Sequence, residues 1–423
     1  MHVLLLLLLV QDTRQVTEPV IPKSCTVLKA RLAAIEEDQP DTARIQRALD
    51  TCPAGQSVEL AGKVFLTGPL QLRAGVTLLV DAGATLYGSR NPRDYDLSPG
   101  SCGIVDKRGH GCKALISGDH VSGAAVMGEG TIDGRGGAQL IGQKVSWWDL
   151  AQEAKVKNLN QSVPRLMALS HCDNFTLYKI RLHNSANFHV AYSGGNGFTA
   201  WGVIIYSPKT ARNTDGIDPG NAQNVTIKRC FIKTGDDNVA IKAGLPGPTG
   251  HMTIEDNHFY TGHGMSIGSE TDGGASAIRV RNLSIDGADN GIRIKSNSSR
   301  GGPVRDVVYE DVCIKDTKNP IMMDPNYSFM GEARDKLPSF ENIILRNVRV
   351  LSAGKITLDG FDAAHPLGIT FDNLFLDVPS KITVSHANIT EGPDGVDFGT
   401  HGNDVHVVKN SCEGKFVPFP GGN

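Results

Sequence analysis

A short pattern of alternating apolar and polar residues recurs along most of the chain. The pattern starts at eight positions, which are Phe175, Phe198, Val225, Met252, Ile278, Val307, Ile343 and Ile369. Successive starts lie 23 to 36 residues apart, and the longest interval contains an insertion around Pro325 to Pro338. Alternation with a period of two predicts strands with one buried face, and a regular spacing of this size is typical of repeat architectures. The sequence therefore predicts an all-β solenoid.

A parallel β-helix fits this repeat best. Leucine-rich repeats have a similar length, but their ladder of Leu and Asn is absent, and a propeller blade needs roughly 40 residues. In a parallel β-helix each coil supplies several short strands, which stack about 4.8 Å from those of the next coil. We therefore expect residues 21–423 to form one β-helix domain.

The N-terminal end of such a solenoid needs a cap, because an open end exposes apolar surface and unpaired strand edges. Residues 41–52 supply a candidate, since their apolar side chains recur at i, i+3, i+4 and i+7 on one face of a helix. These side chains are Ile45, Ala48, Leu49 and Cys52. We expect a short capping helix here.

Composition agrees with a β-rich chain. Of 423 residues, 48 are glycine, and aromatic residues make up 6%, which suits many short strands joined by tight turns. The net charge of −3 gives no general attraction for nucleic acid or for an anionic membrane. A polyanionic substrate would therefore need a local basic patch.

The first residues resemble an export signal. The apolar run from Val3 to Val10 is long enough for the core of a signal peptide and too short to span a bilayer. We therefore expect residues 1–20 to be a signal peptide or a disordered N-terminus, and the protein to be secreted.

The eight cysteines include no CxxC pair, so zinc and thioredoxin-like sites are not favoured. Cys102 and Cys112 flank a polar segment, and a disulfide between them would close a loop and indicate an oxidising compartment; the alternative is two buried thiols. Cys52 could bond Cys25 and tie the N-terminal tail to the cap. The cysteines expected to remain buried, unpaired thiols are Cys172, Cys230 and Cys313.

Polar residues recur at matching offsets in successive coils. Asp236 lies eleven residues after Val225, and His263 lies eleven residues after Met252. If these coils are in register, Asp236 or Asp237 lies beside His263.

The coils before and after extend this group. The preceding coil carries Asn213 and Asp215. In the following coil, Gly291 to Lys295 align with Gly264 to Gly268, so that Arg293 matches Ser266, and Arg293 and Lys295 share one face of a strand. Crowded carboxylates differ in protonation, so that one can act as an acid while others stay ionised. The cations could bind the carboxylates of an anionic sugar chain. The sequence therefore predicts acid/base hydrolysis of a glycosidic bond.

Each of these residues has an ordinary explanation when taken alone. Asp next to Gly is common in turns, His263 could be a packing residue, and Arg293 and Lys295 could form a solvated strand face. The consecutive acids Asp236 and Asp237 are harder to explain, because like charges side by side cost stability without a role. Their occurrence together at matching offsets favours an active site.

Four motifs in this order resemble the signature of glycoside hydrolase family 28, the polygalacturonases. They are Asn213-Thr-Asp215, Gly235-Asp236-Asp237, Gly262-His263-Gly264 and Arg293-Ile-Lys295. The resemblance covers nearly the whole chain and is greatest to the endo-acting bacterial enzymes of plant pathogens. It implies a right-handed parallel β-helix that hydrolyses α-1,4 bonds between galacturonate units with inversion.

The resemblance also implies a role for each site residue. Asp236 matches the general acid, Asp215 and Asp237 match the pair that activates water, and His263 matches the residue that tunes the acid. The residues that match substrate-binding positions are Asn213, Arg293, Lys295 and Tyr327. No metal and no cofactor are implied.

Alternative functions remain open. An exo-acting polygalacturonase differs only in loops that block one end of the groove. A pectate lyase shares the architecture but needs calcium, which His263 and Lys295 would oppose electrostatically. A non-catalytic adhesin would not need an acid pair beside a histidine. We expect a monomer whose partner is pectin, with no nucleic acid or membrane partner.

Overall fold

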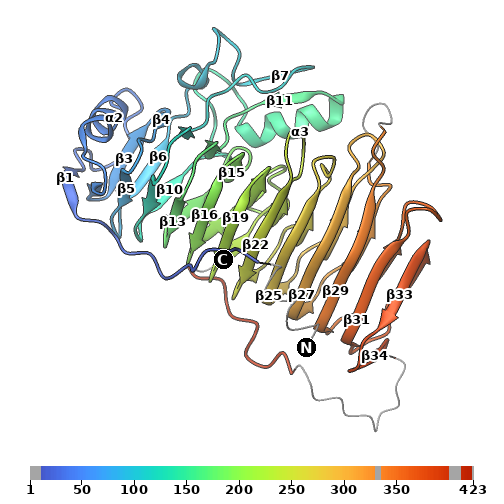
Figure 1. The fold of residues 1–423 in the computed structure, drawn as a ribbon. Coiled ribbons are helices and arrows are strands. Elements are labelled where there is room, and N and C mark those ends of the chain that lie inside the picture. Colours follow the sequence, from blue (N-terminus) through green and yellow to red (C-terminus); the bar gives the residue numbers. More distant parts are fainter. Residues whose placement is uncertain (1–10, 329–334, 400–410, 422–423) are drawn as a thin grey trace. The chain divides into compact units, whose positions relative to one another are not determined.

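The computed structural model describes residues 11–328, 335–399 and 411–421 (Figure 1). These residues form two compact units. The N-terminal unit comprises residues 17–218 and 233–236, and the C-terminal unit comprises the described residues among 11–16, 219–232 and 237–421. Within the described part of the chain, no helix is both long enough and apolar enough to cross a membrane. The expectation of one domain stays a prediction.

In the N-terminal unit each coil contributes short strands to three columns, and every pairing along a column is parallel. The first column contains β1 (Ser24–Lys29), β2 (Ser57–Ala61), β5 (Thr77–Val80), β9 (Ala125–Met127), β13 (Phe175–Tyr178) and β16 (Asn196–Trp201). The second contains β3 (Val64–Thr67), β6 (Thr85–Gly88), β10 (Thr131–Asp133), β14 (Arg181–His183) and β17 (Ile204–Tyr206). The third contains β4 (Leu70–Gln71), β8 (Ile116–Asp119), β12 (Met167–Ser170) and β15 (Val190–Ser193).

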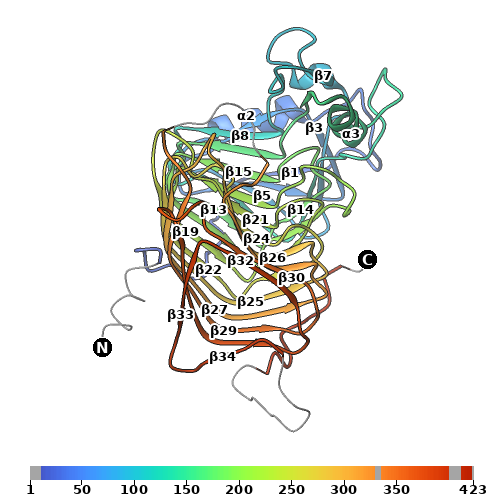
Figure 2. The same cartoon turned by 90° about the vertical axis from the view of Figure 1, so that its right-hand side faces the viewer.

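The C-terminal unit repeats this plan with longer strands, seen as the successive arrows from β25 to β33 in Figures 1 and 2. One column contains β19 (Gln223–Lys228), β22 (Thr249–Glu255), β25 (Ala275–Asp286), β27 (Pro303–Lys315), β29 (Ser339–Val350), β31 (Leu367–Leu376) and β33 (Ala387–Glu391). A second column begins with β20 (Phe231–Lys233) and β23 (His258–Phe259). It continues as the C-terminal halves of β25 and of the long strands after it, and it ends with β34 (Val396–Asp397), which pairs with β31. A further column contains β21 (Val239–Ile241), β24 (Met265–Ile267), β26 (Asn290–Lys295), β28 (Asn319–Asp324), β30 (Lys355–Asp359) and β32 (Lys381–Ser385). The short strand β18 (Ile217–Gly220) precedes β19 in the chain.

The register within each unit confirms the repeat read from the sequence. Phe175 pairs with Phe198 in the N-terminal unit. In the C-terminal unit the paired residues are Val225, Met252, Ile278, Val307, Ile343 and Ile369, each opposite the next. All of these side chains are buried, with at most 2% of their surface exposed. Stacking of like on like fills the interior of each coil, and this packing fixes the register.

Polar residues in the left-handed backbone region turn the chain at the corners of the coils. Asn174, Asn224 and Asn282, which begin Asn-x-Ser/Thr triplets, have φ of 50°, 56° and 50°. Asparagine tolerates this conformation better than most residues. Asn282 also donates from Nδ2 to Oδ1 of Asp256 in the preceding coil, at 2.7 Å. These asparagines therefore serve as coil turns.

The predicted capping helix is present as α2 (Thr42–Thr51), and it buries Ile45, Ala48 and Leu49. Cys52 directly follows it and forms a disulfide with Cys25. Both parts of the prediction for this end of the solenoid are thus confirmed.

The other cysteines give one confirmation and one correction. Cys102 and Cys112 form the expected disulfide, and Cys172 and Cys230 are buried thiols outside any disulfide, as expected. The expectation for Cys313 was wrong, because it is bonded to Cys412. The separation of 99 residues explains the error, since only the fold brings the C-terminal segment back to the strand β27 that carries Cys313.

The segment 411–421 follows several coils of the C-terminal unit, and its red ribbon is visible in Figure 1. The hydroxyl of Tyr260 donates to the carbonyl of Val417 at 2.9 Å, and its ring packs edge-on against Phe419. Lys415 donates to the side chain of Asn282 in the next coil. The segment therefore contacts strands or corners of successive coils.

Residues 11–16 contact two strands of the C-terminal unit, to which they belong. Asp12 is buried, accepts a hydrogen bond from Thr226 Oγ1 at 2.7 Å, and donates from its backbone N–H to Thr253 Oγ1 at 3.1 Å. The apolar run from Val3 to Val10 lies outside the described residues, so the expected signal peptide stays a prediction.

Candidate active site

Asp237 is the centre of a buried polar group in the C-terminal unit, with 1% of its surface exposed. Arg293 donates from Nη2 to Asp237 Oδ1 at 3.0 Å, and Lys295 donates from Nζ to Oδ2 at 2.8 Å. Ser266 donates from Oγ to the same Oδ1 at 2.8 Å and accepts from Arg293 Nε at 3.1 Å. Both carboxylate oxygens are therefore bound by donors from two following coils.

The sheet register explains why these side chains meet. Ser266 on β24 pairs with Arg293 on β26, and Lys295 lies two residues further along the same strand. Residues two apart on a strand point to the same side, so both cations face the carboxylate. The alignment of these two coils predicted from the sequence is confirmed.

Electrostatics keep Asp237 ionised. Burial alone would raise the pKa of this carboxyl, but the charges of Arg293, Lys295, Lys242 and His263 outweigh burial and hold the pKa well below its usual range. Burial lowers the pKa of Lys295, which Asp237 opposes and Arg293 reinforces. The group therefore contains a carboxylate that stays negative even in acidic solution.

Tyr327 forms one wall of this group. Its ring lies 5.6 Å from the guanidinium carbon of Arg293 and 5.1 Å from Nζ of Lys295, within the range of cation–π contacts. The backbone holds the ring in place, because Tyr327 N–H donates to the carbonyl of Ser296 and Asn297 Nδ2 donates to the carbonyl of Tyr327. The structure thus brings Tyr327 to the two predicted cations.

His263 lies in the loop before β24, between two glycines with positive φ. A Cβ on Gly264 would lie 2.2 Å from the carbonyl oxygen of Asn290, so only glycine fits there. The side chain of His263 is 32% exposed, and its Nε2 lies 3.9 Å from Asp289 Oδ2. The imidazole is therefore open to solvent while its backbone is fixed.

Asn213 and Asp236 meet in the N-terminal unit. The backbone N–H of Asn213 donates to Asp236 Oδ2 at 3.2 Å, and its Nδ2 lies 3.4 Å from the same oxygen. Asn213 has a φ of 56°, which turns its N–H towards that carboxylate. A Cβ on Gly235 would lie 2.1 Å from the carbonyl oxygen of Ala211, so the glycine before Asp236 allows these two loops to approach.

Asp215 is also buried in the N-terminal unit, with 3% of its surface exposed. Its backbone carbonyl accepts hydrogen bonds from the N–H of His189 at 2.8 Å and from the imidazole Nδ1 at 3.0 Å. Burial lowers the pKa of His189 to about 4, so this histidine is neutral above that pH. His189 therefore holds the main chain of Asp215 without adding charge.

Asn213 also lines a cavity of about 430 Å³ in the N-terminal unit. Two half-buried cations line it, Arg165 and Arg212. Arg165 stacks over the ring of Phe188 at 5.1 Å, and Arg212 donates to Gln161 Oε1 at 3.2 Å. Two guanidinium groups therefore line the same cavity as Asn213, which binds Asp236.

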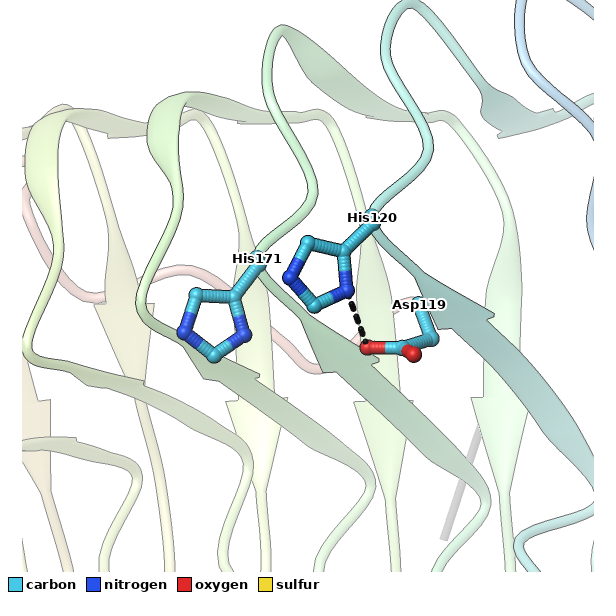
Figure 3. Close-up of side chains that lie close together, drawn as sticks. All are labelled: Asp119, His120 and His171. Atoms are coloured by element: carbon cyan, nitrogen blue, oxygen red, sulfur yellow. Dashed lines mark hydrogen bonds and ion pairs between the residues drawn. The ribbon is translucent and has the colours of Figure 1, made fainter.

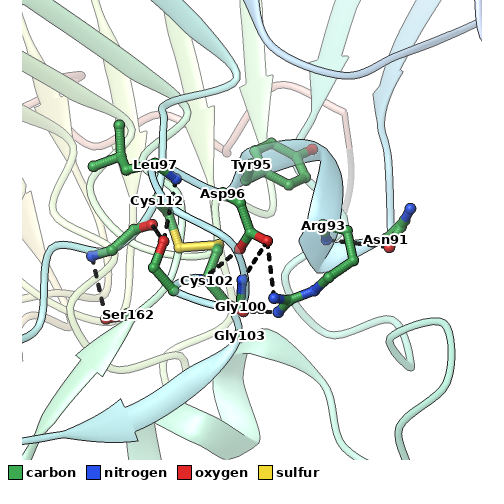
Figure 4. The surroundings of a disulfide bond; sticks show 12 residues. Asn91, Arg93, Tyr95, Asp96, Leu97, Gly100, Cys102, Gly103, Cys112 and Ser162 are labelled. Carbon is green, nitrogen blue, oxygen red and sulfur yellow. Dashed lines mark hydrogen bonds and ion pairs between the residues drawn. A yellow bond between two sulfur atoms is a disulfide. The ribbon is translucent and has the colours of Figure 1, made fainter.

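The disulfide between Cys102 and Cys112 closes a loop (Figure 4). Gly109, His110 and Cys112 of this loop line the same cavity. Asp96 accepts hydrogen bonds from the backbone N–H of Cys102 and of Gly100, both at 2.8 Å. The 3₁₀ helix η1 (Pro92–Tyr95) precedes this loop. The loop itself contains β7 (Ile104–Asp106), which pairs antiparallel with β11 (Asn160–Ser162), and helix α3 (Trp147–Lys157) contacts both strands. The loop is therefore tied down at several points.

Comparison with known proteins identifies the family. The model of the glycosyl hydrolases family 28 matches residues 46–412. The chain belongs to this family. It is therefore a glycosidase.

Relatives in this family are similar over most of their length. The chain is 44% identical to an endo-polygalacturonase of Pectobacterium parmentieri, over 89% of this chain and 93% of the relative. It is 39% identical to a polygalacturonase of Ralstonia nicotianae, over 92% and 85% of the two chains. The solved structure of a polygalacturonase from Erwinia carotovora ssp. carotovora matches with a TM-score of 0.85 and 44% identity, over 90% of this chain and all of that one. The fold is therefore the expected right-handed parallel β-helix.

Two residues of the candidate active site were not predicted from the sequence. Ser266 bridges Asp237 and Arg293, and its position opposite Arg293 in the predicted alignment could have identified it. His189 lies in a strand-like run without any motif, and only the fold shows that it supports Asp215. The remaining site residues fall into two groups, with Asn213, Asp215 and Asp236 in one unit and Asp237, His263, Arg293, Lys295 and Tyr327 in the other.

Proposed function

We propose that this chain hydrolyses α-1,4 bonds between galacturonate units inside polygalacturonan chains, with inversion at the anomeric carbon. The observation that carries the proposal is the buried carboxylate of Asp237, held ionised by Arg293 and Lys295 and directly following Asp236 in the chain. The similarity to an endo-polygalacturonase of Pectobacterium parmentieri supports the endo-acting mode.

The two consecutive acids have different roles in this proposal. Asp237 stays ionised, so it cannot donate a proton but can accept one from water, together with Asp215. Because Asp237 stays ionised, we assign the role of proton donor to the glycosidic oxygen to its neighbour, Asp236. The proton that Asp236 gives to the leaving group is balanced by the proton that the attacking water gives to the pair Asp215 and Asp237.

The two cations bind the substrate. Arg293 and Lys295 carry two positive charges against the single negative charge of Asp237, so these three side chains keep a net charge of +1. A galacturonate carboxylate can complete this group, and a planar guanidinium suits a carboxylate well. Tyr327, packed against both cations, offers a flat surface for the sugar ring.

The other residues assist these steps. His263, fixed between two glycines and open to solvent, tunes the protonation of Asp236, and Asn213 positions the same carboxylate. The cavity lined by Arg165 and Arg212 accommodates further galacturonate units of the same chain. We further propose that the protein is secreted, acts as a monomer through one catalytic domain at residues 21–423, and needs no cofactor.

The test is digestion of unesterified polygalacturonic acid by the purified protein, followed by reducing ends, viscosity and ultraviolet absorbance together. An endo-acting hydrolase produces an early fall in viscosity, new reducing ends and no new absorbance. A large release of reducing ends with almost unchanged viscosity would mean exo action. New ultraviolet absorbance would mean a lyase, because elimination leaves an unsaturated uronide.

A further inference from the structure

Two histidines and an aspartate gather at a corner of the N-terminal unit, and none of them has a role in the proposed catalysis (Figure 3). Asp119 is the last residue of β8 and pairs with Ser170, the last residue of β12. His120 and His171 follow these strands, so the register places them one above the other. Their rings stack with centroids 4.6 Å apart and planes 7° from parallel.

Each of the three side chains has a potential metal-binding atom close to those of the other two. One ligand atom of Asp119, one of His120 and one of His171 all lie within 4.8 Å of one another. His120 Nδ1 lies 2.9 Å from Asp119 Oδ1, and Ser170 Oγ lies 2.9 Å from His171 Nδ1. The side chains of Asp119 and His120 are 73% and 70% exposed, so an ion can reach them directly from water.

The backbone brings the two histidines to the same corner. His120 and His171 have φ of 51° and 49°, so both leave the corner of the coil in the same direction. The equivalent position in the next coil is Gly194, where a Cβ would lie 2.9 Å from the ring of His171. A larger residue there would push against the imidazole, so the glycine leaves room for the ring.

We propose that Asp119, His120 and His171 form a binding site for a late first-row divalent metal ion such as Zn²⁺. Two imidazole nitrogens and one carboxylate suit Zn²⁺, Cu²⁺ or Ni²⁺, whereas Ca²⁺ and Mg²⁺ prefer oxygen ligands. To bind one ion, the exposed rings turn out of their parallel stack so that one nitrogen of each points to the metal. The ion takes the place of the hydrogen bond between His120 and Asp119, and water completes its coordination. Because the ligands come from two successive coils, the bound ion joins these coils. This proposal is independent of the proposed catalytic function.

Calorimetric titration of the untagged protein with ZnCl₂ tests the site. The variants are His171→Asn, His120→Asn and Asp119→Asn, because asparagine tolerates the left-handed backbone that the histidines adopt. The expected result is binding by the wild type that weakens at least tenfold in either histidine variant and less in the aspartate variant. CaCl₂ and MgCl₂ should give no binding that depends on these residues.

The matched control is His386→Asn. His386 is exposed, follows the strand β32 at the same kind of corner and has a φ of 47°, but the equivalent position in the preceding coil is Gly360 instead of a second histidine. This variant should bind Zn²⁺ as the wild type does. Asp237→Asn, which alters the proposed catalytic group, should also retain the binding that depends on His171.

Two further measurements decide between this site and binding elsewhere on the chain. Cu²⁺ bound to the wild type should show electron paramagnetic resonance couplings from two nitrogens, and one of them should be lost in His171→Asn. Zn²⁺ should raise the Tm of the wild type and of His386→Asn but not that of His171→Asn. Equal Zn²⁺ affinity in the wild type and in His171→Asn would overturn the proposal.

Discussion

Asp237 and Glu255 lie in the same unit, and each binds two cations, yet only Asp237 lies in the proposed active site. Asp237 binds Arg293 and Lys295, whose side chains are 5% and 6% exposed. Glu255 binds Lys228 and Arg281, whose side chains are 20% and 41% exposed. In both cases burial would raise the pKa of the carboxyl, and the two cations lower it below its usual value. Both carboxylates are therefore paired in the same way, and they differ in exposure to water. We call Asp237, Arg293 and Lys295 the inner group, and Glu255, Asp256, Lys228 and Arg281 the outer group.

The two groups differ in net charge, and this difference indicates why only one of them binds substrate in our proposal. Each carboxylate has an acidic neighbour in the chain, Asp236 before Asp237 and Asp256 after Glu255. Lys228 lies 3.7 Å from Asp256, so two acids balance two cations in the outer group. In the inner group Asp237 alone binds both cations, which leaves a buried positive charge that costs folding free energy. An anionic substrate would offset that cost, and the outer group needs none.

The largest effect on activity is expected at Asp236, and none is expected at Asp256, the acid in the corresponding place beside Glu255. Asp236→Asn should lower kcat by about 10²–10⁴-fold, because it removes the proposed proton donor. Asp256→Asn, the matched change beside Glu255, should leave kcat unchanged. Initial rates on polygalacturonic acid, together with circular dichroism to confirm folding, make the measurement. Full activity in Asp236→Asn would exclude the proposed acid.

The next effect concerns the two central carboxylates. Asp237→Asn leaves Arg293 and Lys295 buried without their counter-charge and should cost about 3–5 kcal/mol of unfolding free energy, as well as activity. Glu255→Gln should cost about 1 kcal/mol or less, since water reaches its partners. Urea denaturation at neutral pH gives both values. Equal losses would mean that burial does not distinguish the groups.

A pH profile tests the cations of the inner group. The folded-state pKa of Asp237 is lowered, so its ionised form, and the stability this adds, persist above the unfolded pKa of about 3.9 and are lost only as the pH falls further. Lys295→Met removes one of the two bound cations, so Asp237 should become protonated at higher pH. The acidic limb of kcat/KM should move to higher pH and KM should rise. An unmoved limb would show that Asp237 does not govern it.

The smallest effect is expected for Arg281→Gln in the outer group. This exposed side chain should contribute about 0.2–1 kcal/mol, and the loss should shrink as salt is added. The pH profile of hydrolysis should stay as in the wild type. Denaturation at low and high ionic strength is the measurement, and a loss as large as that of Asp237→Asn would contradict the comparison.

Much of the fold was predictable because one physical signal repeats along the chain. Alternating apolar residues at Val225, Met252 and Ile278 had to stack to bury their side chains, and the sheet register follows that stacking. The same register aligned the strand of Arg293 and Lys295 with the strand of Ser266, although Ser266 itself was not recognised as a site residue. Local periodicity therefore predicts contacts between neighbouring coils.

Contacts that skip coils or lack a motif were not predictable in this way. The disulfide of Cys313 with Cys412 depends on the path of the C-terminal segment, which has no repeat of its own. His120 and His171 are 51 residues apart, far from the common spacing, because the long excursion that contains α3 lies between their coils. Only the three-dimensional structure shows that they are adjacent in register.

The C-terminal segment has a consequence for how this unit unfolds. Solenoid coils usually interact only with their nearest neighbours, so such proteins can lose terminal coils one at a time. Here residues 411–421 bind Tyr260, Asn282, Cys313 and Arg349, which belong to four successive coils. Loss of any one of these coils also disturbs the segment that the other three share. We therefore expect these coils to unfold together in a single cooperative step, and reduction of the Cys313–Cys412 bond to broaden that transition.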